Sequence, residues 1–86
     1  MTLAQKTEAI RADFVAGKIS GDNLLLHLEP VLSQAANDPG TQHEARTLVN
    51  RIERALFTEA EQRKSSAVVH LLDACVAFVR SIELKT

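Results

Sequence analysis

The sequence predicts an all-α protein, folded as an antiparallel bundle of four helices. Apolar residues recur at three- and four-residue spacings in four segments, which is the period of a helix face. Residues that favour helix starts and stops separate these segments with short connections. Sustained alternation and Asn-Gly or Asp-Gly turns, the marks of strands and hairpins, are missing. A chain of 86 residues suits one domain, so residues 1–86 are expected to share one core.

The first helix is expected to begin at once and to end before Gly17. Thr2 and Gln5 have the spacing of a capping box, in which each side chain bonds the other's backbone amide. Gly17 suits the left-handed residue that commonly follows a helix. The predicted apolar face comprises Leu3, Thr7, Ile10 and Phe14.

The stretch GKISGDNL, residues 17–24, is expected to be a joint between helices. Ser20 fits the N-cap of the next helix, and Ile19 and Leu24 then occupy the two positions of a hydrophobic staple. A phosphate-binding loop would need G-x-x-x-x-G-K-[ST] after a strand, whereas here Ile follows Gly-Lys and a helix precedes. The spacing of a calcium-binding EF-hand loop is missing as well.

The second helix is expected to run from about Ser20 to Ala36. Pro30 lacks an amide hydrogen, so it should either kink this helix or split it. Leu26 points away from the apolar face, unless a kink rotates it inward. That face comprises Leu24, Leu25, Leu28, Val31, Leu32 and Ala35.

Residues 37–40, NDPG, are expected to form a turn, after which Thr41 caps a third helix and Glu44 completes a capping box. Its predicted apolar face comprises Ala45, Leu48, Val49, Ile52 and Leu56.

The sequence does not place the next turn more closely than residues 57–66, because residues 58–66 are polar on all sides. Thr58 with Glu61 is one capping box, and Ser65 or Ser66 is the alternative cap. The last helix is apolar over half its circumference, which predicts that it is the central one. Its apolar residues are Val68, Leu71, Leu72, Cys75, Phe78, Val79 and Ile82, with Val69 and Val76 at the edge.

Composition excludes several kinds of protein. The formal net charge of −1 exerts no general attraction on nucleic acid or on anionic lipid. The single cysteine excludes an intrachain disulfide and a cysteine-based zinc site. Neither a secretory signal nor an apolar run long enough for a membrane span is visible. We therefore expect a cytoplasmic protein that does not bind a membrane, and the charge disfavours nucleic acid as its partner.

No catalytic residue, metal ligand or cofactor site is expected. His70 and Asp73 are the only histidine–carboxylate pair at helical spacing, and two ligands leave a metal site incomplete. Cys75 lies within the apolar face of the last helix, where a thiol is inert. The sequence therefore predicts that the protein is not an enzyme.

The candidate partner-binding residues are on the third helix, on the side away from its apolar face. Gln42 is part of the same stripe, and the predicted binding set is Arg46, Asn50, Arg54 and Phe57, together with Leu26 of the second helix. Three readings stay open. The stripe is a solvated helix face, a protein-binding surface anchored by Phe57, or a recognition helix that reads DNA bases. Glu53 within the stripe argues against the third.

The pattern F-V-A-G-K-I-S-G-x-x-L, from Phe14 to Leu24, resembles a segment of colicin D-type immunity proteins. The resemblance is confined to this segment and implies a small helical bacterial protein that masks a toxin nuclease. The primary expectation is a non-catalytic adaptor or regulatory module that binds another protein or forms a homodimer. An immunity- or antitoxin-like protein and a helix-turn-helix nucleic-acid binder are the alternatives.

Overall fold

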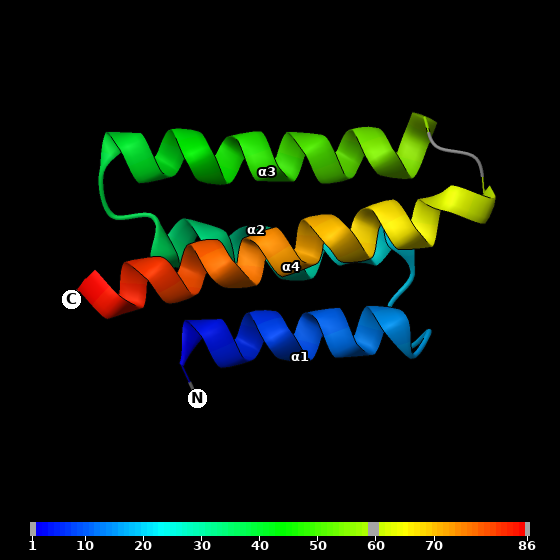
Figure 1. The fold of residues 1–86 in the computed structure, drawn as a ribbon, viewed down its shortest axis with the longest axis horizontal. Coiled ribbons are helices and arrows are strands. Elements are labelled where there is room, and N and C mark those ends of the chain that lie inside the picture. Colours follow the sequence, from blue (N-terminus) through cyan, green and yellow to red (C-terminus); the bar gives the residue numbers. More distant parts are fainter. Residues whose placement is uncertain (1, 59–60, 86) are drawn as a thin grey trace.

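The computed structural model describes residues 2–58 and 61–85, and it confirms the all-α bundle. Four helices run in alternating directions (Figure 1). Their bounds are α1, Leu3–Val15; α2, Gly21–Ala35; α3, Pro39–Thr58; and α4, Glu61–Lys85. No strand occurs in the described part of the chain.

The bundle is flattened, with dimensions of 38 × 24 × 18 Å. Helices α2 and α4 each contact the three others, whereas α1 and α3 do not contact each other within the described residues. Figure 1 shows α1 and α3 at opposite edges, with α4 between them in front of α2. The last helix is therefore central as predicted, but it shares the centre with α2.

The core is built from aliphatic side chains of all four helices. Burying one large side chain of this kind stabilises the fold by about 1.5–3 kcal/mol. The residues with no measurable exposure are Leu24, Leu28, Ile52, Val68, Leu72, Cys75 and Val79, joined by the hydroxyl-bearing Thr7. The Thr7 hydroxyl donates to the carbonyl oxygen of Leu3 at 2.8 Å, so this buried polar group is satisfied.

The predicted caps of α1 are confirmed at both of its ends, whereas the predicted cap of α2 is confirmed only in position. The Gln5 amide donates to Thr2 Oγ1 at 3.1 Å, and the Thr2 amide donates to Gln5 Oε1 at 2.9 Å. Gly17 has φ of +80°, the left-handed region that stops α1. Ser20 is the N-cap residue of α2, although its side chain makes no capping hydrogen bond.

Gly21 lets the start of α2 approach the end of α3 closely. A Cβ atom at this position would lie 2.8 Å from Cδ2 of Leu56, which is well inside van der Waals contact. The Leu56 side chain of α3 therefore packs directly against the backbone of α2 at this end of the bundle.

Helix α2 passes through Pro30 without a break, so of the two expected outcomes the split is not observed. Proline removes the bond that a residue-30 amide would donate to the Leu26 carbonyl. Both Leu26 and Pro30 are exposed, so water can satisfy that carbonyl oxygen. Leu26 keeps its outward orientation and is 69% exposed.

Helix α3 begins at Pro39, so the prediction of Thr41 as its N-cap is wrong. The Thr41 amide donates to Asp38 Oδ1 at 2.8 Å, and the Asp38 amide donates to Thr41 Oγ1 at 3.1 Å. Asp38 is therefore the capping residue and Thr41 its reciprocal partner one turn later. Pro39 fits the first helical position because its ring fixes φ near the helical value and no amide hydrogen is needed there.

Helix α4 already includes Ser65 and Ser66, so neither caps it. The Thr58 hydroxyl donates back to the Arg54 carbonyl at 2.6 Å within α3. Residues 59–60 and the side chain of Glu61 are outside the described part, so the predicted capping contact of Thr58 with Glu61 is outside it as well.

Charged side chains form ion pairs across the contact between α1 and α4. Arg11 pairs with Asp73, and Arg80 pairs with Glu8. The Ala4 amide, in the first turn of α1, donates to Glu83 Oε1 at 2.8 Å. A carboxylate at a helix N-terminus also interacts favourably with the helix dipole.

Candidate protein-binding groove

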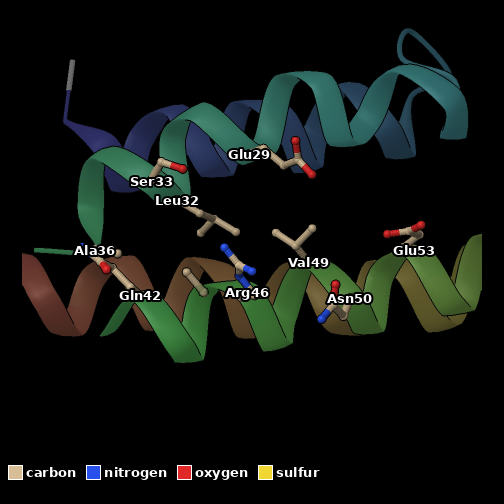
Figure 2. A pocket seen from close by; sticks show the side chains of 10 residues that line it. Glu29, Leu32, Ser33, Ala36, Gln42, Arg46, Val49, Asn50 and Glu53 are labelled. Carbon is tan, nitrogen blue, oxygen red and sulfur yellow. The ribbon is translucent and has the colours of Figure 1, made fainter. Parts of the chain in front are cut away.

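A groove of about 530 Å³ lies between α2 and α3. Four side chains form its apolar floor: Leu32 of α2, its C-cap residue Ala36, and Ala45 and Val49 of α3. Six polar side chains form its rim: Glu29 and Ser33 of α2, and Gln42, Arg46, Asn50 and Glu53 of α3 (Figure 2).

The helical period places these residues on facing surfaces. Along the chain, successive lining residues of each group are one or three positions apart, which keeps them on one side of the helix. Small side chains at Ala36 and Ala45 leave the space open at the end of the groove where α2 meets the turn to α3. The floor is thus apolar surface at the edge of the core, and it stays uncovered between α2 and α3.

Charges of both signs face the groove. Figure 2 shows the Arg46 guanidinium extending from α3 toward α2, and the Glu29 side chain along the edge of α2 that borders the same space. Glu53 lines the same groove, about one helical turn beyond Val49 along α3. Within residues 2–58 and 61–85, none of these three side chains forms an ion pair, in contrast to the paired charges between α1 and α4.

The structure brings two of the five predicted binding residues into the groove, Arg46 and Asn50. Phe57 is 74% exposed and lines a smaller pocket of about 310 Å³. The other residues around that pocket are Gly21, Asp22, Leu25, Leu56 and Lys64. Arg54 is exposed and lines neither space.

Leu26 lies at the edge of the groove rather than in it. It is separated from Ser33 by about 20° around α2, and Phe57 from Arg46 by about 20° around α3. Both large apolar side chains are exposed on the sides of their helices that carry the groove rim. The predicted exposure of these two residues is confirmed.

Sequence reasoning missed Glu29 and Ser33 as site residues. They are a polar pair four residues apart on α2, which by itself describes any solvated helix face. Their role depends on α2 packing beside α3, and the sequence does not reveal which helix faces pair. Glu53 was noticed only as an argument against DNA binding.

Of the other candidates for chemistry, Asp73 is paired and Cys75 is buried. Asp73 bonds Arg11 rather than forming the first half of a metal site with His70. Burial raises the pKa of the Cys75 thiol to about 12. No group of three metal-ligating side chains occurs among the described residues.

Comparison with protein-family models, with curated proteins and with solved structures finds no match to this chain. Across residues 2–58 and 61–85, no helix combines the length and the apolar character needed to cross a bilayer.

Proposed function

We propose that this chain is a non-catalytic adaptor or regulatory protein that binds another polypeptide chain through the α2–α3 groove. The observation that carries the proposal is an apolar floor surrounded by polar side chains, three of them charged and unpaired within the described residues. Protein interfaces have this arrangement, with an apolar centre and a polar rim that fixes orientation. Phe57 and Leu26 extend the apolar surface beyond the groove.

The shape of the groove favours a helical segment as its occupant. Its walls are two antiparallel helices, and from Gln42 to Glu53 it extends about 17 Å along α3, or roughly three helical turns. Amphipathic helices commonly bind in such grooves by their apolar face. An immunity- or antitoxin-like role is the special case in which the partner is a toxin.

The electrostatics argue against nucleic acid as the partner. A phosphate approaching Arg46 would also meet Glu29 and Glu53, which line the same groove. Affinity for nucleic acid depends on several uncompensated cations, and this groove has more acidic than basic side chains. A cytoplasmic, bacterial setting fits the single buried thiol, since such compartments keep thiols reduced.

Affinity capture from the native host tests the proposal. The immobilised protein should retain a partner, which is either another protein or an untagged copy of this chain. The immobilised Arg46→Glu variant should not retain that partner. Arg51→Glu is the matched control, because Arg51 carries the same charge on α3 but does not line the groove. Retention that is equal for both variants, or no retained protein at all, would contradict the proposed function.

A further inference from the structure

We propose that the occupant of the α2–α3 groove is a second copy of this chain, placed antiparallel across a twofold axis. The axis would pass between Val49 and Asn50 of α3. The inference rests on the proposed function, because it names the partner of that same groove.

The first support is the distribution of charge along α3. Five of the six groove residues of α3 fall, with Phe57, within about 100° of its circumference, and Ala45 lies about 40° beyond them. The five are Gln42, Arg46, Val49, Asn50 and Glu53. Arg46 and Glu53 are equally far from the midpoint between Val49 and Asn50, one in each direction.

A twofold axis at that midpoint brings opposite charges together twice. Arg46 of each copy then faces Glu53 of the other copy, and Glu29 contributes a second carboxylate on the same groove. A parallel arrangement of the two α3 helices would instead place Arg46 against Arg46 and Glu53 against Glu53. Like charges across an interface are strongly unfavourable, so the charge pattern selects the antiparallel arrangement.

The second support is the position of Phe57. Its distance from the midpoint equals that of Gln42, so the same axis places Phe57 of one copy at the Gln42 end of the other copy's groove. Leu32, Ala36 and Ala45 provide apolar surface there, between α2 and α3. The most exposed aromatic ring in the described chain, at 74%, would thereby be buried against an apolar floor.

The available area is sufficient for a specific dimer. Helix α3 is about 30 Å long and α2 about 22 Å, and each helix is about 10 Å wide. Together they offer about 500 Å² per copy, or about 1,000 Å² in total, which is the minimum for a specific interface. Isologous twofold dimers are the commonest assemblies of a single chain.

Sedimentation equilibrium with complementary charge reversals tests the arrangement. The wild-type protein should dimerise between about 1 and about 100 μM. Arg46→Glu and Glu53→Arg should each weaken dimerisation by about tenfold or more, since the twofold axis turns each single change into two repulsive contacts. An equimolar mixture of the two variants should form a heterodimer, because both of its charge pairs are again attractive. Far-UV circular dichroism checks that each variant stays folded.

Arg51→Glu is the control, with the same change in net charge outside the groove, and it should dimerise as the wild type does. The inference is overturned by a wild type that is monomeric at about 100 μM. It is also overturned if the mixture of the two variants fails to restore dimerisation, or if Arg51→Glu weakens dimerisation as much as Arg46→Glu does. A monomeric wild type that still captures a different protein through Arg46 would overturn only the second copy as occupant and leave the proposed function in place.

Discussion

Gly17 determines where α1 ends because its backbone has φ of +80°. A Cβ atom there would meet no other atom within 4 Å, so any cost of substitution comes from backbone strain and not from a clash. We expect Gly17→Val to lower the free energy of unfolding by about 1 kcal/mol or more. Gly17→Asn should cost less, since asparagine tolerates the left-handed region. Urea denaturation measures both, and equal losses would contradict the strain explanation.

Cys75 makes stability depend on pH in the alkaline range. Burial raises the thiol pKa from 9.0 to about 12, so the folded state holds its proton where the unfolded state releases it. This contribution is fully present below pH 9 and is lost as the pH rises from 9 toward 12. Between about pH 8 and about pH 10, the wild type should lose roughly 1 kcal/mol more than Cys75→Ala does. Urea denaturation at both pH values tests this, and parallel losses would contradict it.

At the level of elements, the two ends of α3 illustrate which boundaries a sequence reveals. The start was misplaced by three residues because Asp38 and Thr41 both have capping side chains. Reading Asp38-Pro39 as a cap followed by the first helical residue would have placed it correctly. The sequence does not show where α3 ends and α4 begins, since residues 58–66 have no periodic pattern of apolar residues.

The cap of α3 gives a test of the corrected boundary. Asp38→Ala should cost about 1 kcal/mol because the Thr41 amide loses its acceptor. Glu44→Ala should be nearly neutral, since Glu44 is exposed and is not the partner of the cap. Thermal or urea denaturation measures both changes. A neutral Asp38→Ala combined with a destabilising Glu44→Ala would restore Thr41 as the cap.

The helix faces were predictable, whereas the groove was not. The apolar period of α2 correctly identified Leu24, Leu28 and Leu32 as core residues, and it placed Leu26 outside. The groove arises from the side-by-side position of α2 and α3 and from the small side chains Ala36 and Ala45. A period along one helix contains no information about which neighbour it meets, so Glu29 and Ser33 were missed.

For the whole molecule, the flattened bundle has two contrasting sides. On one side, α1 and α4 are joined by the pairs Arg11–Asp73 and Arg80–Glu8 and by the contact of Glu83 with α1. Exposed ion pairs contribute little stability, about 0–1 kcal/mol each, but they satisfy the charges of that surface. On the other side, the α2–α3 groove holds charges of both signs around an apolar floor. This asymmetry is the physical basis for assigning the binding role to the α2–α3 side.

Amide chemical-shift mapping tests most directly whether the α2–α3 groove is the binding surface. Isotope-labelled protein is titrated with the unlabelled polypeptide that it captures, whether another protein or a second copy of the chain. The largest changes should fall within residues 29–36 of α2 and residues 42–57 of α3, where the groove and Phe57 lie. Changes confined to α1 and the outward side of α4, with the groove amides unaffected, would contradict the central claim.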